Sequence, residues 1–288
     1  MKIKSQLFLI VKSLLLLLTF SFSLSSSAAD NKAVRLVVAA PHIVEMLYAI
    51  GAGDSIIGTT EHSDYPQAAT KIPRIGNYAG LQVERILQLK PDYIVAWKTG
   101  NPEVDLNRLE KLGMTVVYSN PTDLKSVADE LIMLGELTGQ KSKANQIATA
   151  YMDKLNRLKQ KYKTHQPISV FYQLWTAPLT TVANNAWPQQ LLAICQVDNP
   201  FIALKGDYPQ LSIEHVMMAK PKLIIIPTST GEPNQIKGYW QQFNAIPAVK
   251  NKQIITVNSD KLHRMTPRAL DELEVMCEKI DNARAVYF

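Results

Sequence analysis

Two glutamates stand at matching places in two stretches that repeat along the chain. Glu84 and Glu214 lie 130 residues apart. Each falls in the first turn of an expected helix, where the helix dipole favours a carboxylate, and this local effect explains the placement by itself. The alternative is that two similar lobes each present one exposed acid to a partner with two-fold symmetry, through charge-assisted contacts to arginines.

A second set of side chains suits a bulky, flat ligand. Tyr65, Tyr78, Trp97 and Tyr208 fall in loops or at the ends of expected strands. If they line one cleft, they form an apolar wall for a large ring, although Tyr and Trp also serve simply as core residues. Hydrogen bonds from the opposite wall could come from one later loop, which holds Asp260, Lys261, His263 and Arg264.

Three histidines, His42, His62 and His263, lie just after expected strands or in strand-to-helix loops. A three-histidine zinc site is one interpretation, but the spacing carries no ligand signature, and solvated loop histidines are the commoner case. The sequence contains no nucleophile elbow, phosphate loop or His-Glu-x-x-His pair, so nothing in it indicates an enzyme.

The elements that would position these residues come in two similar halves. Residues 81–97 and 211–227 share one pattern, a short amphipathic helix stopped by Lys-Pro and followed by a buried strand. Because proline excludes the residue before it from the α region, the helices should end near Lys90 and Lys220. Strands alternate with helices in both halves, which predicts an α/β fold with parallel sheets. The longest helical pattern, residues 140–162, is the expected connector.

The first 29 residues have the layout of a secretory signal peptide, in which lysines precede an apolar run and small residues follow up to Ala28 and Ala29. The apolar run is too short and too rich in serine to suit a membrane anchor. Removal of this segment lowers the formal net charge from +6 to +3. A charge that small does not favour nucleic acid as a partner.

The sequence has two cysteines, Cys195 and Cys277. An exported chain meets an oxidising compartment, which favours a disulfide over two separate buried thiols. Closing a loop of this size could stabilise the fold by about 4 kcal/mol.

At the level of motifs, the chain resembles the periplasmic substrate-binding proteins of ABC importers, in the class that carries siderophores, haem and vitamin B12. The Lys-Pro-Asp repeat is common to the whole class. The stretch Ala96-Trp97 with Gly100-Asn101, and the two cysteines, are more specific and most similar to vitamin B12 (cobalamin) binders. Further matching residues are Ser63–Pro66, Gly80, Glu84–Ile86, Leu89–Asp92, Pro209-Gln210, Tyr239-Trp240, Ser259-Asp260 and Pro267-Arg268.

The resemblance implies a class III periplasmic binding protein, with two pseudo-symmetric α/β lobes of parallel sheets joined by one long helix. The segments would be a signal peptide at 1–29, an N-terminal lobe at 30–138, a connecting helix at 139–164 and a C-terminal lobe at 165–288. Such a protein is no enzyme. In the periplasm it would bind vitamin B12 between its lobes, as a transported ligand and not a cofactor. It would then deliver the vitamin, as a free monomer, to an inner-membrane ABC permease dimer with its ATPase subunits.

Residue by residue, the resemblance assigns transporter docking to Glu84 and Glu214. It assigns ligand contacts to His62, Tyr65, Tyr78, Trp97, Tyr208, Asp260, Lys261, Leu262, His263 and Arg264. The chain departs from the family pattern where His62 replaces an aromatic residue and Tyr78 and Tyr208 replace tryptophans.

Histidine and tyrosine are also the iron ligands of haem proteins, so a haem or ferric-siderophore binder of the same fold is the alternative. An exported α/β enzyme or a metal chaperone is the third hypothesis.

Overall fold

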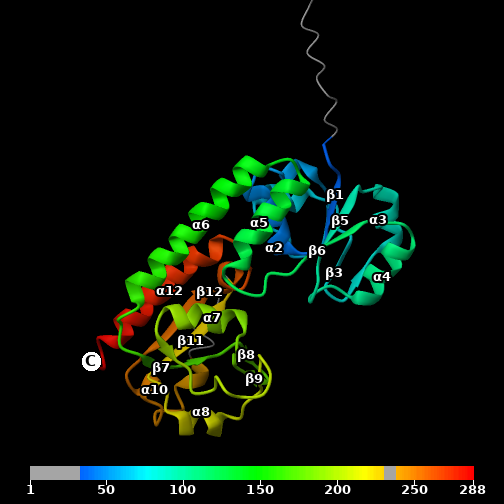
Figure 1. The fold of residues 1–288 in the computed structure, drawn as a ribbon. Helices are drawn as coiled ribbons and strands as arrows, with labels where there is room; N and C mark the ends of the chain where they lie inside the picture. The colour runs from blue at the N-terminus through cyan, green and yellow to red at the C-terminus, as the bar shows by residue number, and fades with distance from the viewer. Residues whose placement is uncertain (1–32, 230–237) are drawn as a thin grey trace, which may run out of the picture. The chain divides into compact units, whose positions relative to one another are not determined.

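Two four-stranded parallel sheets form the framework of this computed structural model, which describes residues 33–229 and 238–288. The signal peptide predicted at 1–29 lies outside the described residues. The strand orders are β2-β1-β5-β6 in the N-terminal lobe and β10-β7-β11-β12 in the C-terminal lobe (Figure 1). By position along the chain, both orders read second, first, third, fourth. The α/β fold predicted from the alternating pattern is therefore confirmed, and the two lobes share one topology.

The strands of the first sheet are β1 (Leu36–Val38), β2 (Ile56–Thr59), β5 (Tyr93–Trp97) and β6 (Val116–Ser119), and those of the second are β7 (Ile168–Tyr172), β10 (Val197–Asp198), β11 (Leu223–Thr228) and β12 (Ile254–Asn258). The helices are α2 (Pro41–Ala49), α3 (Val83–Leu89), α4 (Glu103–Lys111), α5 (Ser126–Leu137), α6 (Lys141–Tyr162), α7 (Trp187–Ile194), α8 (Ile213–Ala219), α10 (Pro247–Lys250), α11 (Ser259–Leu262) and α12 (Arg268–Arg284). Among the described residues, no helix combines the length and the apolar character of a bilayer span.

Helix α6 is the long helix between the two sheets in sequence, and it packs against α5 and α12 (Figure 1). Its buried residues include Ala144, Tyr151 and Leu158, at the three- and four-residue spacing of one helix face. On the polar side, the Lys154 ammonium lies 2.6 Å from Asp271 of α12. Since α5 belongs to the N-terminal lobe and α12 to the C-terminal lobe, α6 contacts both lobes.

The two repeated helices end alike, at Lys90 and Lys220. Both lysines adopt the left-handed conformation, with φ of 48° and 47°, and their N–H groups bond back to Leu87 and Val216. The predicted stop before proline is correct, and the backbone escapes the α region into the left-handed region instead of extending. Strands β5 and β11 follow at once and enter the core.

One hydrophobic cluster passes through both lobes. It contains Leu36 and Val95 of the first sheet, Ile168 and Leu223 of the second, and the buried face of α6. A smaller cluster covers the other face of each sheet, under α3 and α4 in one lobe and around Trp240 in the other. Strands buried on both faces are what the apolar runs of the sequence predict.

Two short hairpins and one short helix were not expected from the sequence. The hairpins are β3 (Gly76–Asn77) with β4 (Gly80–Leu81), and β8 (Trp175–Thr176) with β9 (Leu179–Thr180). Strands of two residues are too short to show periodicity. Helix α11 lies in the stretch expected to be a loop, where the Asn258 side chain accepts from the Lys261 N–H and caps it.

A disulfide joins Cys195, just after α7, to Cys277 of α12, so the predicted pairing is confirmed. Both sulfurs are buried in the large hydrophobic cluster, and the bridge spans 82 residues. It fixes the last helix to the C-terminal lobe.

We expect the double variant Cys195→Ala/Cys277→Ala to lose about 2–4 kcal/mol of unfolding free energy, because its unfolded chain is no longer held in a loop. Urea unfolding followed by circular dichroism measures the loss. The matched control is wild-type protein unfolded with and without a reductant, which should reproduce the difference. An unchanged unfolding midpoint in both comparisons would contradict a stabilising role for the bridge.

Candidate functional site

A cavity of about 680 Å³ opens where the carboxyl ends of strands from both lobes meet. In parallel α/β sheets, ligands bind at this edge. The N-terminal lobe contributes Trp97 at the end of β5, Thr99 just after it, and the segment Asn120–Thr122 that follows β6. The C-terminal lobe contributes a larger share, namely Leu174, Asn185, Ala186, Trp187, Pro188, Asp207, Tyr208, His263 and Met265.

A second cavity, of about 430 Å³, shares Leu174 and His263 with the first and therefore continues it. Its other lining residues are Gln173, Trp175, Thr176, Ile226, Pro227, Ser229 and Ser259. Of the described residues that line the two cavities, Asp207 is the one formally charged side chain. The lining otherwise consists of aromatic, aliphatic, hydroxyl, amide and imidazole groups, which suits a large uncharged ligand.

Trp97 is held through its backbone and through its ring. The backbone N–H of Trp97 donates to Asn101 Oδ1 at 2.7 Å, and Asn101 Nδ2 donates to the Ala39 carbonyl at 2.8 Å. A Cβ atom at position 100 would overlap the indole, so Gly100 is required there. The His42 ring meets the indole edge to face, with centroids 5.2 Å apart. The residues of the Ala-Trp-x-x-Gly-Asn motif thus hold the Trp97 side chain in one position.

His42 and His263 are both neutral at physiological pH. Burial, helped by the charge of Arg264, lowers the pKa of His42 to about 3. Burial also lowers the pKa of His263 to about 4, although Asp260 opposes the shift. His263 Nε2 lies 2.7 Å from the hydroxyl of the buried Tyr172, whose pKa is raised by burial, so this pair is uncharged. The cavity therefore gains a polar but neutral side chain.

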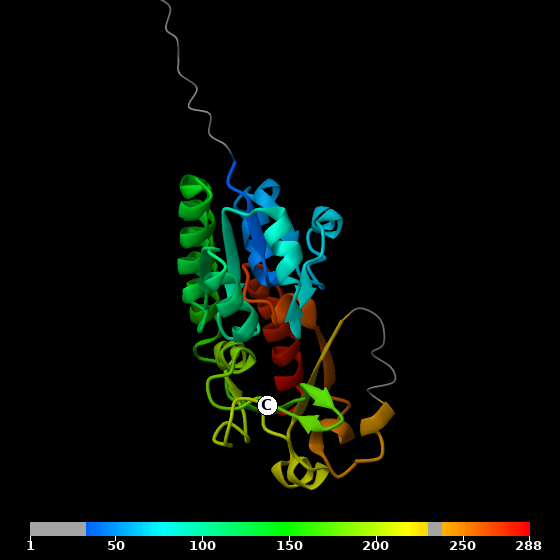
Figure 2. The ribbon, with the colours of Figure 1, turned by 90° about the vertical axis from the view of Figure 1, so that its right-hand side faces the viewer.

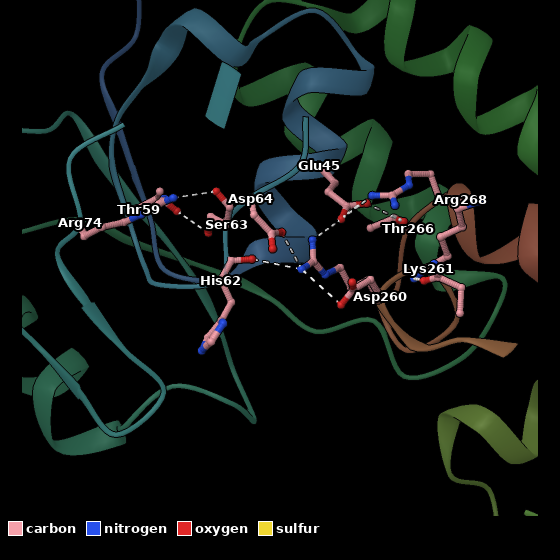
Figure 3. A network of polar contacts seen from close by, with 12 residues as sticks. Glu45, Thr59, His62, Ser63, Asp64, Arg74, Asp260, Lys261, Thr266 and Arg268 are labelled. Carbon is pink, nitrogen blue, oxygen red and sulfur yellow. Dashed lines mark hydrogen bonds and ion pairs between the residues drawn. The ribbon is translucent and has the colours of Figure 1, made fainter. Parts of the chain in front are cut away.

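A buried ion cluster connects the two lobes beside the cleft (Figure 3). Glu45 of α2 is almost fully buried, and its Oε1 lies 2.6 Å from Arg264 Nη1 and 2.9 Å from Arg268 Nη1. Thr266 Oγ1 donates to the other carboxylate oxygen at 3.2 Å. One acid of the N-terminal lobe thereby binds two bases of the C-terminal lobe, where low dielectric strengthens the attraction.

The rim of this cluster belongs to the loop after β2. Arg264 Nη2 donates to Asp64 at 2.8 Å and to the His62 carbonyl at 3.1 Å. Burial alone would raise the pKa of Asp64, but the hydrogen bond and charge of Arg264 outweigh it and hold the pKa below its usual value. The Arg268 guanidinium lies 3.5 Å from the centroid of the Tyr65 ring, a cation–π contact. Arg264 therefore pairs with two acids of the N-terminal lobe, Glu45 and Asp64.

The structure brings together some of the predicted ligand contacts and separates others. Trp97, Tyr208 and His263 line the main cavity. Tyr78 is 78% exposed on the β3–β4 hairpin, and the Leu262 side chain is fully buried in the core. The remaining predicted contacts gather at the ion cluster or on its rim: His62, Tyr65, Asp260, Lys261 and Arg264.

The cluster residues have different orientations. The His62 ring points away from the ion pairs in Figure 3, and its backbone φ of 66° is left-handed. Asp260 is 3.9 Å from Arg264, and Lys261 is 4.0 Å from Glu272. Arg264 has little exposed surface left for a ligand, because Glu45 and Asp64 already pair with it.

Most of the lining residues were not predicted from the sequence, and four residues of the site are the most informative omissions. Trp175 and Trp187 line the cavities, and Glu45 and Arg268 carry the ion cluster. The tryptophans could have been found as aromatic residues beside loops, which was the signal used for Trp97. Glu45 carries no such signal, because a single acid on an apolar helix gives no indication of its partner.

Across the described residues, no three His, Cys, Asp or Glu side chains are grouped so that they could hold a metal ion. His42, His62 and His263 belong to three different environments, namely the Trp97 contact, the cluster rim and the cavity wall. The three-histidine zinc interpretation gains no support from these positions.

The sequence model of one protein family, described as "Periplasmic binding protein", matches residues 36–261. The chain belongs to the periplasmic binding protein family. This family consists of binding proteins and is not a family of enzymes.

Among the periplasmic binding proteins, the chain is similar over most of its length to relatives named for vitamin B12 binding. The chain is 37% identical over 263 residues to a "Vitamin B12-binding protein" of Vibrio vulnificus, covering 91% of this chain and 94% of that protein. It is 34% identical over 264 residues to a protein of the same name from Vibrio parahaemolyticus, covering 91% and 95%.

Solved structures of periplasmic binding proteins agree with the fold. The periplasmic vitamin B12 binding protein BtuF of Vibrio cholerae matches with a TM-score of 0.81 and 35% identity, over 88% of this chain and 98% of that one. The periplasmic haem binding protein HutB of Vibrio cholerae matches with a TM-score of 0.75 over 86% and 98%, at 18% identity, which shows the shared fold alone.

The two glutamates predicted to dock a transporter occupy equivalent places in this periplasmic binding protein. Glu84 and Glu214 are exposed in the first turns of α3 and α8, which lead into β5 and β11, the third strands of the two lobes. Glu84 pairs with Arg108 at 2.9 Å on the surface. A hydrogen bond from Ser212 lowers the pKa of Glu214, so this acid is ionised at neutral pH.

We expect Glu45→Gln to lower the unfolding free energy by about 3 kcal/mol, because two partly buried arginines lose the buried carboxylate that pairs with both. Urea unfolding measures the effect. The matched control is Glu84→Gln, which removes an exposed ion pair and should cost less than about 1 kcal/mol. Equal and small losses in both variants would contradict a stabilising role for the buried cluster.

Proposed function

We propose that the protein binds vitamin B12 (cobalamin) in the cleft between its lobes and delivers it to an inner-membrane ABC importer. The observation that carries the proposal is the lining of the two joined cavities, which is aromatic and polar but contains one charged side chain among the described residues. Similarity to vitamin B12-binding proteins over most of the chain supports the same ligand.

The chemistry of the ligand explains why this lining favours a corrinoid. Cyanocobalamin has no net charge, and its large flat ring is surrounded by amide side chains, which need hydrogen-bonding partners and not counter-ions. In the proposed complex, Trp97 and Tyr208 contact the apolar parts of the ligand, and neutral His263 hydrogen-bonds to a polar group. His62, Tyr65, Tyr78, Asp260, Lys261, Leu262 and Arg264 remain predicted contacts, which the ligand would reach at the rim or through backbone groups.

Haem is the second candidate ligand, and the cavities suit it less well. Haem carries carboxylates, which proteins bind with arginine or lysine, and no such side chain is among the described lining residues. Iron also needs an axial ligand, and the His263 Nε2 atom is already engaged by Tyr172 at 2.7 Å.

We expect purified protein to bind cyanocobalamin in calorimetry, and Trp97→Ala to weaken the binding by about tenfold or more, because it removes a fixed aromatic surface. The control is a parallel titration with haemin, monitored by the Soret band. If cyanocobalamin gives no heat, and haemin gives a Soret shift in the wild type but not in Tyr208→Phe, then haem and not vitamin B12 is the ligand.

Within the same proposal, the protein acts in the periplasm as a monomer and is not an enzyme. Its transporter is a permease dimer with ATPase subunits, and Glu84 and Glu214 are its docking residues. The support for docking is the shared placement of the two acids, each exposed at the start of a helix that precedes the third strand of its lobe. A dimeric permease has two equivalent surfaces, which two pseudo-symmetric lobes can match.

We expect Glu84→Arg/Glu214→Arg to abolish vitamin B12 uptake by cells and leave the affinity of the purified protein for cyanocobalamin unchanged, because both acids lie outside the cleft lining. Uptake assays with labelled vitamin and calorimetry measure the two quantities. Glu136→Arg, which reverses another exposed, ion-paired acid, is the matched control and should transport normally. A large loss of affinity in the double variant would contradict the docking role.

A further inference from the structure

Trp175 is mostly exposed to solvent, unlike the other tryptophans of the chain. The chain has four tryptophans. Trp187 and Trp240 are 6% and 0% exposed and Trp97 is partly buried, whereas Trp175 is 67% exposed. A large aromatic side chain held in water contributes nothing to folding by burial, so its position calls for another explanation.

The backbone beneath Trp175 is firmly attached to the C-terminal lobe. Trp175 lies in the β8–β9 hairpin, the pair of light green arrows in Figure 2, where it pairs with Thr180. The buried side chain of Gln173 accepts from the indole N–H of the fully buried Trp240 at 2.7 Å. The same amide donates to Thr176 Oγ1 at 2.9 Å. One side chain therefore connects the hairpin to the core.

The exposed indole stands at the edge of the cleft. Trp175 lines the cavity of about 430 Å³ together with Pro227, at the end of β11. That cavity shares Leu174 and His263 with the main cavity, whose lining includes Trp97. A ligand that fills both cavities would extend from the fixed indole of Trp97 to the indole of Trp175.

We propose that Trp175 is a ligand-contacting residue that covers part of a flat, conjugated ring ligand and thereby contributes to specificity. The inference rests on the proposed function, because it assigns a second aromatic wall to the same cleft. A rigid backbone and an aromatic side chain with only two torsion angles suit such a contact, since little conformational freedom is lost when the ligand binds. Because the lining around Trp175 carries no charge among its described residues, the contact selects for a ring and not for a charged group.

Hydroxyl-radical footprinting with mass spectrometry, on the full mature protein with and without cyanocobalamin, tests the contact directly. In the free protein, Trp175 should be the most heavily labelled tryptophan, and saturating cyanocobalamin should protect it. Trp240 should stay unlabelled in both samples and serves as the internal reference.

Calorimetry on variants provides the second readout. We expect Trp175→Ala to weaken cyanocobalamin binding by about tenfold and Trp175→Phe to retain most of the affinity, because phenylalanine preserves an aromatic face. Both variants should keep the wild-type urea midpoint, since the indole is exposed. Phe288→Ala, which removes another exposed aromatic residue at the C-terminus, is the matched control and should bind normally.

The outcomes separate the inference from the proposed function. If cyanocobalamin binds but leaves Trp175 labelled, and Trp175→Ala binds like wild type, the role of Trp175 is refuted while the proposed function stands. If wild-type protein does not bind cyanocobalamin at all, the proposed function fails, and the inference fails with it.

Discussion

The buried carboxylate of Glu45 is the polar contact on which the meeting of the two lobes depends. It comes from the first helix of the N-terminal lobe and faces Arg264 and Arg268 of the C-terminal lobe. In a low-dielectric setting, a charge without its partner is strongly unfavourable, so the three groups hold one another in place. The shared hydrophobic cluster holds the lobes together, but hydrophobic contacts are not directional. The ion pairs are directional, and they favour one orientation of the lobes.

This arrangement also determines the character of the cleft. Arg264 is the cation that lies nearest in sequence to the cavity residue His263, but it points its charge at Glu45 and Asp64. Apart from Asp207, the described lining of the cleft consists of neutral side chains, several of them aromatic. A neutral, ring-shaped ligand therefore suits it better than an anionic one.

Pseudo-symmetry has different consequences at the two ends of the repeated unit. Helices α3 and α8 begin with an exposed acid and end in a left-handed lysine, so the lobes are alike where the chain enters the third strand. At the far end of that strand, the N-terminal lobe presents Trp97 and the C-terminal lobe presents Pro227 at the equivalent place in the repeat. The indoles that the second lobe places at the cleft, Trp175 on its hairpin and Trp187 at the start of α7, both lie outside the repeat. The lobes therefore differ where a ligand without two-fold symmetry would bind.

The sequence by itself determined the alternation of strands and helices, the stops at Lys90 and Lys220, and the long helix, because each depends on local periodicity and on proline. Their places at strand ends and in loops also indicated Trp97, Tyr208 and His263 as ligand contacts, the family resemblance assigned them the same role, and all three line the cavity. Only the tertiary structure decided which groups pair across lobes. Glu45 and Arg264 are 219 residues apart, and no local pattern specifies such a partner. The same holds for Trp175, whose hairpin is too short for a periodic signal and whose exposure depends on packing around Gln173 and Trp240.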